Sequence, residues 1–159
     1  MAKVPPFDMP MAERRRLLAP LRVDMSVAVV RAKNPFNVGA IIRVAHSYLV
    51  REVFLVGTEP YYERASMGMQ RYENIVDCED EATFPSDVVL LFGSENDGVP
   101  PRLLEASSQV IAIPMYGVNH SFPVSVAAGM VLCEWARRRD PRGGQDVPCT
   151  YIGPNRRLA

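Results

Sequence analysis

The chain has 159 residues, of which 48% are apolar, and its 18 basic and 18 acidic side chains give a formal charge of zero. A chain of this size buries one good core, so we expect a single domain. No apolar run is long enough to cross a bilayer and no signal-peptide core follows the start, so we expect a cytoplasmic protein with no membrane partner.

Several classes of site are disfavoured by missing motifs. The three cysteines, Cys78, Cys133 and Cys149, are odd in number and widely spaced. They lack the paired spacing of zinc ligands, so we expect reduced thiols and no metal. The sequence also has no phosphate-loop motif, no dinucleotide-binding glycine fingerprint and no serine-hydrolase elbow.

Charge is distributed unevenly along the chain. Arginines gather near both ends, at residues 14–16 and at residues 137–139. On composition alone, the simplest interpretation is that these arginines are solvent-exposed or cap helices. The alternative is that the two basic ends converge on a polyanion such as RNA. Acidic residues fill the middle, and the run from Glu73 to Glu81 is predicted to be a solvated loop or helix face.

The first third of the chain predicts a basic arm followed by a βαβ unit. Met11 to Leu18 is expected to form a short helix, and Met25 to Val30 a buried strand. The Asn-rich turn from Asn34 to Gly39 then leads into a helix, and Glu52 to Val56 forms the second strand. The turn therefore lies at the carboxyl edge of the sheet, where ligands bind in open α/β folds.

Two segments near this turn are candidates for ligand contact. Arg43 follows Gly39 by four residues, close enough to reach a phosphate or hydroxyl bound at the turn. The alternative interpretation of Arg43 is a surface helix arginine. Ser66 to Tyr72 has no sustained periodicity and is expected to be a mobile loop within reach of a substrate.

The next segment predicts two further strands. Val88 to Phe92 is expected to be a buried strand that runs into a G-x-E-x-x-G turn from Gly93 to Gly98. This turn places one carboxylate, Glu95, at the sheet edge. Pro101 to Ser107 predicts a short helix, and Gln109 to Ile113 a buried strand.

The stretch from Ile111 to Arg139 combines more backbone constraints than any other. A polar loop follows Pro114, and Pro123 stands where a first-turn proline would start a helix. That helix is apolar on two sides, so we expect its first turns to be buried all round. A polar loop on such a rigid base is typical of a ligand site. His120 lies in this loop and a binding role is open, whereas His46 is expected to be a helix-side residue.

Three turns in this order resemble a known family. N-P-F-N-V-G-A-I-I-R begins at Asn34, L-F-G-S-E-N-D-G-V at Leu91, and I-P-M-Y-G-V-N-H-S-F-P-V-S-V-A-A-G at Ile113. They resemble the three motifs of the SpoU/TrmH-type branch of the SPOUT methyltransferases, and the resemblance covers Val27 to Arg138. It implies an α/β fold: a single minimal SPOUT domain over 23–140, with a mostly parallel sheet flanked by helices and a C-terminal trefoil knot. Residues 1–22 would be a Pro-rich basic arm and 141–159 a basic tail.

The resemblance also implies a chemistry and a set of residues. It implies S-adenosyl-L-methionine as cofactor, the ribose 2′-hydroxyl of tRNA or rRNA as acceptor, and a homodimer whose interface completes each site. The implied catalytic residues are Arg43, Asn37, Glu95 and Ser121. The implied cofactor residues are Leu91, Phe92, Gly93, Glu95, Gly98, Ile113, Met115, Gly117, Ser121 and Val124. The implied RNA-binding residues are Arg14, Arg15, Arg16, Arg43, Arg71 and His120.

One departure from the family pattern leaves alternatives open. The third motif usually reads S-L-N-V-S, whereas Ser121 to Ser125 reads S-F-P-V-S, so Pro123 replaces an amide side chain. The main interpretation is an RNA 2′-O-ribose methyltransferase. The alternative is a knotted RNA-binding module that holds the cofactor with little or no catalysis, and a third option is methylation of a base nitrogen.

Overall fold

The computed structural model describes residues 8–31, 34–78, 88–94, 97–114, 116, 118 and 121–139, with the backbone alone at 139. Its α-helices are α1 (Met11–Leu18), α2 (Pro35–Ser47), α3 (Pro101–Glu105) and α4 (Val124–Arg139). Three 3₁₀ helices are η1 (Ala19–Leu21), η2 (Glu63–Ser66) and η3 (Met69–Arg71). The strands are β1 (Met25–Val30), β2 (Val53–Val56), β3 (Ile75–Cys78) and β4 (Val88–Phe92).

The four described strands form one parallel sheet in the order β3-β2-β1-β4. Val27 of β1 is in register with Val53 on one side and with Leu90 on the other. The chain thus moves outward from β1 through β2 to β3 and then returns to β4 on the opposite side of β1. That reversal is a topological switch point, and in open α/β sheets ligands bind at the carboxyl ends of the strands beside it.

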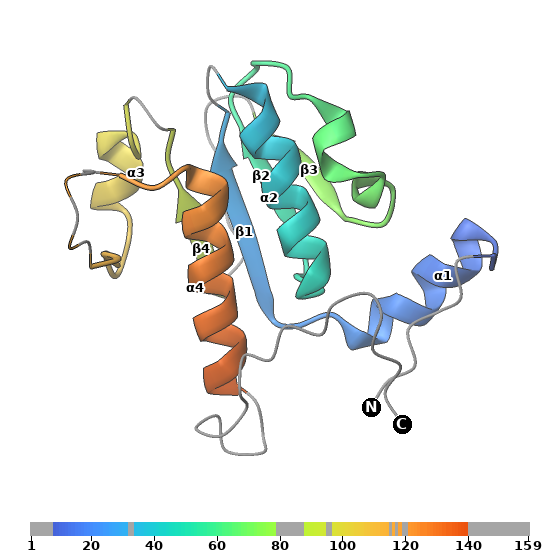
Figure 1. The fold of residues 1–159 in the computed structure, drawn as a ribbon. Coiled ribbons are helices and arrows are strands. Elements are labelled where there is room, and N and C mark those ends of the chain that lie inside the picture. The colour runs from blue at the N-terminus through green and yellow to red at the C-terminus, as the bar shows by residue number, and fades with distance from the viewer. Residues whose placement is uncertain are drawn as a thin grey trace.

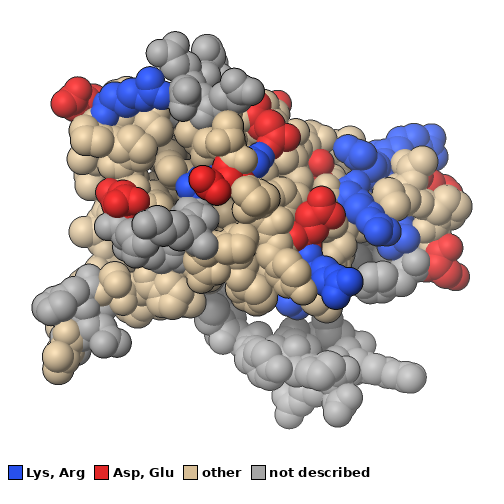
Figure 2. Space-filling model, turned by 90° about the horizontal axis from the view of Figure 1, so that it is seen from above, with Lys and Arg blue, Asp and Glu red and all other residues tan. Residues whose placement is uncertain are grey.

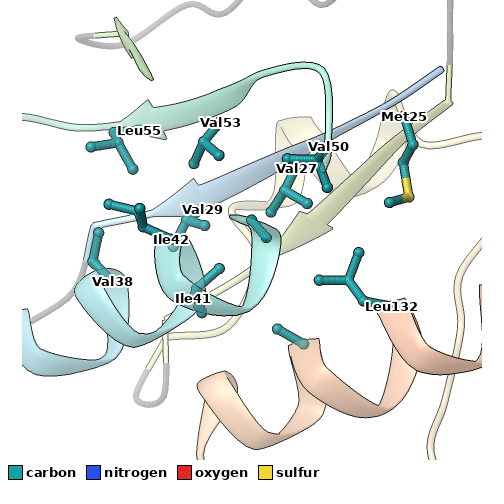
Figure 3. Packing of buried hydrophobic residues seen from close by; sticks show 12 residues of the cluster. Met25, Val27, Val29, Val38, Ile41, Ile42, Val50, Val53, Leu55 and Leu132 are labelled. Carbon is teal, nitrogen blue, oxygen red and sulfur yellow. The ribbon is translucent and has the colours of Figure 1, made fainter. Parts of the chain in front are cut away.

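The core lies between the sheet and two helices, α2 and α4, which run side by side over one face (Figure 1). Figure 3 shows Val27 and Val29 of β1 facing Ile41 of α2 and Leu132 of α4. These side chains are at most 1% exposed, and each contributes roughly 1.5–3 kcal/mol by burial. Both helices begin at the carboxyl edge of the sheet, so the core holds their first turns together there.

The predicted α/β fold with a parallel sheet is confirmed, and the strands at residues 25–30 and 88–92 have the predicted bounds. The strand predicted from Gln109 to Ile113 is wrong. Residues 108–114 form no strand, and Val110 and Ile111 are 69% and 59% exposed. An apolar run shorter than eight residues does not by itself distinguish a buried strand from an apolar surface segment.

The loop predicted from Ser66 to Tyr72 instead contains the end of η2 and all of η3, while its mobility stays a prediction. Ser66 is fully buried and its hydroxyl donates to the carbonyl of Glu63 at 2.7 Å. Met67 (φ 53°) and Gly68 (φ 83°) form the left-handed link between the two 3₁₀ helices. The strand that follows, β3, was not predicted because only its pairing with β2 identifies it.

Glu73 is not the solvated acid that the sequence predicts. Its side chain is 0% exposed, with Oε2 accepting from Arg22 at 2.9 Å and Oε1 lying 2.7 Å from His46 Nδ1. Arg22 also donates to the carbonyls of Val50 and Tyr72. We call Arg22, His46 and Glu73 the Glu73 cluster. It connects the segment before β1, the end of α2 and the segment before β3.

Gly39 allows α2 to pack tightly against η2. A Cβ at Gly39 would lie 2.6 Å from the Tyr62 carbonyl oxygen and 2.8 Å from the Ala65 Cβ. We therefore expect Gly39→Ala to destabilise the fold by about 1–3 kcal/mol through overpacking, measured by urea unfolding. Gly129→Ala in α4 is the matched control: its Cβ meets nothing within 4 Å, so it should be neutral or stabilising. Equal effects of both substitutions would contradict the packing argument.

Candidate functional site

The first turn of the site is built on the start of α2. Asn34 caps the helix, its Oδ1 accepting from the Phe36 backbone N–H at 3.2 Å, and Pro35 occupies the first helical position. Together they begin the helix directly after β1. Asn37 then lies in the first turn and is 8% exposed, so its amide faces the interior at the carboxyl edge of the sheet.

Asn37 contacts the third motif directly. The hydroxyl of Ser125 donates to Asn37 Oδ1 at 3.1 Å, across 88 residues of sequence. The first and third predicted motifs therefore meet in space, where α2 and α4 begin. Ser125 was not among the predicted site residues, although its place as the last residue of the motif S-F-P-V-S could have indicated it.

The second motif forms a closed turn at the end of β4. The backbone groups of Ser94 and Gly98 exchange two hydrogen bonds of 3.0 Å, and the Asp97 N–H donates to the Ser94 hydroxyl at 3.1 Å. A Cβ at Gly93 would lie 2.2 Å from the carbonyl carbon of Gly98, so only glycine fits there. Since β4 and β1 are neighbours, this turn is beside the first motif at the switch point.

Arg43 lies on α2 six residues after Asn37, roughly 9 Å along the helix axis. Its side chain is exposed, and it forms no ion pair with any other residue that the structure describes. Its guanidinium is therefore available to a ligand. His46, one turn further, is the helix-side residue that was expected, and Glu73 is its partner.

The expected cofactor residues are only partly described. Leu91, Phe92 and Gly93 lie at the end of β4, half-buried, and Val124 is at the start of α4. Ile113 is partly buried and Ser121 is exposed. Gly98 has φ 69° in the closed turn. Glu95, Met115, Gly117 and His120 lie outside the described residues.

The residues present fit an adenosyl cofactor. Such a ligand needs an apolar wall together with backbone donors and acceptors. Leu91 and Phe92, half-buried at the end of β4, would supply apolar surface at this edge, and the strand end at Gly93 would supply backbone groups. Among the described residues, no cluster of three His, Cys, Asp or Glu side chains could hold a metal ion.

The basic residues differ in their availability. Arg15, Arg16 and Arg71 are exposed, whereas the guanidinium carbon of Arg14 lies 5.3 Å from the ring centroid of Tyr72. In Figure 2 the blue side chains are densest on the side of the molecule where α1 lies.

The arginines at the end of α4 are paired with an acid. Arg137 and Arg138 both donate to Glu134, at 2.8 Å and 2.6 Å, and these hydrogen bonds lower the pKa of Glu134 to about 2. Glu134 is therefore ionised at neutral pH and offsets part of the charge at this end of the chain. In the described part of the chain, no helix is long and apolar enough to cross a membrane.

Comparison with known proteins finds methyltransferase relatives. The SpoU rRNA Methylase family matches residues 69–133. The tRNA (guanosine(18)-2′-O)-methyltransferase of Thermus thermophilus is 28% identical over 86% of this chain and 88% of that protein. Its counterpart from Escherichia coli K12 is 28% identical over 80% and 69%. A match to the enzyme of Aquifex aeolicus is 41% identical but spans 43% of this chain and about a third (32%) of that protein.

Solved structures extend the match to the fold. A TrmH/SpoU tRNA modifying enzyme from A. aeolicus aligns with a TM-score of 0.70 and 25% identity over 84% of this chain and 86% of that one. An AdoMet-bound rRNA methyltransferase from Sinorhizobium meliloti aligns with a TM-score of 0.61 and 27% identity over 74% and 57%. The fold is an α/β domain in which the first two turns and the start of α4 lie beside a topological switch point. These matches support the SpoU/TrmH-type branch of the SPOUT methyltransferases, the family that the motifs resemble.

Proposed function

We propose that this protein transfers the methyl group of S-adenosyl-L-methionine to a ribose 2′-hydroxyl of tRNA or rRNA. The observation that carries the proposal is the hydrogen bond between Ser125 and Asn37, which joins the first and third motifs beside the second. The relatives support it, since two that cover 80% or more of this chain are named as tRNA 2′-O-methyltransferases and one solved structure is described as AdoMet-bound.

In this proposal Arg43 is the principal catalytic residue. The bound cofactor supplies an electrophilic methyl group on a sulfonium, whose sulfur leaves as a neutral thioether. A ribose hydroxyl is a weak acid and a poor nucleophile, so its O–H bond weakens as its oxygen attacks the methyl carbon, and negative charge develops on the oxygen as the proton leaves. The Arg43 guanidinium stabilises that charge, and its planar fork can hold the adjacent phosphate at the same time. The hydroxyl proton passes to solvent.

The remaining motif residues organise the site. Asn37 and Ser125 hold the starts of α2 and α4 together. Glu95 and Ser121 complete the loops around the cofactor, and His120 and Arg71 extend the RNA contact. We also propose that the loop from Ile113 to Pro123 is threaded as a trefoil knot, which would bring Met115 and Gly117 beside Leu91 to Gly93. The division into arm, domain and tail stays a prediction.

Cofactor binding is the first test of this arrangement. We expect S-adenosyl-L-homocysteine, the demethylated product, to bind with a dissociation constant in the micromolar range by calorimetry. Gly93→Ala should abolish the binding because its Cβ overlaps Gly98. Arg16→Ala, on the exposed surface of α1, is the control and should bind normally. Absence of binding to the wild-type protein at millimolar concentration would contradict the proposed cofactor.

We propose that a second copy of the chain covers the exposed side of α4. The expectation that this helix is buried all round is wrong within one chain, because Val126 and Met130 are 43% and 42% exposed. Val110 and Ile111 add further exposed apolar surface. Surface of this kind marks an interaction site.

The expected mass in equilibrium sedimentation is twice that of the chain, and Met130→Glu should give a folded monomer. Ala136→Glu, also on α4 but three residues before its end, is the control. A wild-type monomer at micromolar concentration that still binds cofactor would rule out a site completed by the dimer.

Turnover separates the enzyme from the binding module. We expect the wild-type protein to transfer labelled methyl groups to RNA purified from cells lacking the gene, and Pro123→Asn to change the rate by less than about threefold. A wild-type protein that binds cofactor but gains transfer only with Pro123→Asn would favour the module without catalysis.

A further inference from the structure

A second polar site lies at the opposite edge of the sheet from the three motifs. A cavity of about 480 Å³ lies between α1 and the segments that precede the strands, and its lining includes Arg15, Arg22, Arg51, Tyr72 and Asn74. The Arg51 N–H donates to the Met25 carbonyl at 2.7 Å, and the Asn74 carbonyl accepts from the Val53 N–H at 2.9 Å. Because Met25 and Val53 begin β1 and β2, the cavity is at the amino edge of the sheet.

The lining is cationic, with three arginines and no carboxylate. Arg22 is held rigidly by Glu73 and by two backbone carbonyls, and its charge is balanced by that buried acid. Arg51 pairs with Asp24 at 2.9 Å, but the Asp24 side chain is 78% exposed, so water and salt weaken the pair. Arg15 is exposed and has no ion pair in the described part of the chain. An anion in the cavity would therefore meet an uncompensated charge from Arg15 and a weakly compensated one from Arg51.

The aromatic ring in the lining does not offer a free stacking face for a base. The guanidinium of Arg14 lies over the Tyr72 ring, 5.3 Å from its centroid. The His46 ring lies at 5.5 Å with an interplanar angle of 36°. With Tyr72 already in contact with two side chains, the cavity fits a phosphate group better than a stacked nucleobase.

We propose that this cavity binds a backbone phosphate of the RNA substrate, with Arg15 and Arg51 as the contacting cations and the Glu73 cluster as their rigid support. The site rests on the proposed function for the identity of its ligand. A six-residue strand such as β1 spans roughly 20 Å, so an RNA that reaches the motif edge needs only a few more nucleotides to reach the cavity. The site would add affinity and register without touching the reacting atoms.

The salt dependence of RNA binding tests this assignment. Each phosphate contact contributes roughly 0.7–0.9 to the slope of log affinity against log salt. We expect Arg15→Ala and Arg51→Ala each to lower the slope by about that amount for bulk tRNA, and to lower affinity roughly threefold near physiological salt. Arg64→Ala is the control, since Arg64 is an exposed arginine on η2 that does not line the cavity.

A further variant tests the cavity without removing an arginine. Asp24→Asn should release Arg51 from its acidic partner and raise tRNA affinity. Circular dichroism confirms folding of each variant. Equal slopes for the Arg15, Arg51 and Arg64 variants would overturn the proposal in favour of an undifferentiated basic surface, as would unchanged affinity of Asp24→Asn.

Failure of the phosphate site can be distinguished from failure of the proposed methyl transfer. If the enzyme is active, Arg15→Ala and Arg51→Ala should raise KM for RNA and leave kcat at saturating RNA unchanged. A fall in kcat with unchanged KM would overturn the remote phosphate site. If no methyl transfer occurs at all, the slopes still decide whether the cavity binds phosphate, because they require only tRNA binding.

Discussion

Arg43→Ala is expected to lower the rate of methyl transfer by at least roughly 100-fold, the effect of removing one preorganised charge-stabilising group. Cofactor affinity should stay within about twofold of wild type, because the loops expected to hold the cofactor lie on β4 and after Ile113. The unfolding midpoint should not move, since the Arg43 side chain is exposed and unpaired within the described residues. Single-turnover transfer at saturating RNA, with calorimetry for the cofactor, measures both quantities.

Two variants serve as controls for this result. Arg43→Lys keeps the charge but loses the planar fork, so we expect it to restore less than a tenth of the lost rate. Arg64→Ala removes another exposed arginine, on η2, and should leave transfer near the wild-type rate. If Arg43→Ala retained half of the wild-type turnover, Arg43 would be a surface helix arginine.

Glu73→Ala is expected to destabilise the fold by roughly 3–5 kcal/mol, because it leaves Arg22 largely buried without its acidic partner. Domains of this kind have a free energy of unfolding of about 5–15 kcal/mol, so the variant should be close to unfolding at physiological temperature. Glu73→Gln keeps the shape and one acceptor and should lose less. Urea unfolding monitored by circular dichroism measures the difference.

The matched control for the Glu73 variants is an exposed ion pair. Asp24→Asn removes the partner of Arg51, whose acid is 78% exposed, so we expect a change of no more than about 1 kcal/mol. Comparable losses from Glu73→Ala and Asp24→Asn would show that the buried cluster has no special structural role.

The parts of the fold that were predicted correctly are those marked by patterns within a short stretch of sequence. Met25 to Val30 and Val88 to Phe92 are almost wholly apolar runs, a pattern typical of strands in a parallel sheet, although β4 is only partly buried and Val88 is 43% exposed. Asn34 and Pro35 are a cap and a first-turn proline, so the start of α2 could be read directly. Because parallel strands all end at the same edge of a sheet, the turns that follow β1 and β4 are predicted to lie together at its carboxyl edge.

The parts that were missed depend on contacts between distant residues. Glu73 is buried because Arg22, 51 residues away, and His46, 27 residues away, meet it. No pattern around Glu73 indicates those partners, and its acidic neighbours suggest a solvated surface. The bond from Ser125 to Asn37 likewise exists only because α2 packs against α4.

Pro123 is better tolerated than the family pattern suggests. Its carbonyl accepts from the N–H groups of Val126 and Ala127, at 2.9 Å and 3.1 Å, directly before the first residue of α4. A backbone N–H at this point of a helix has no intrahelical acceptor, so a proline loses no helical hydrogen bond there. Ser125 provides the polar side chain that contacts the first motif. Both features favour an active enzyme.

The most direct test of the central claim is where the transferred methyl group resides. Purified protein is incubated with methyl-labelled S-adenosyl-L-methionine and RNA from cells lacking the gene, and the RNA is then hydrolysed in alkali. Alkaline cleavage requires a free 2′-hydroxyl, so a 2′-O-methyl group protects the adjacent linkage. The account predicts label in alkali-stable dinucleotides, lost with Arg43→Ala. Label in mononucleotides, which indicates a methylated base, or no label in RNA despite bound cofactor, would contradict it.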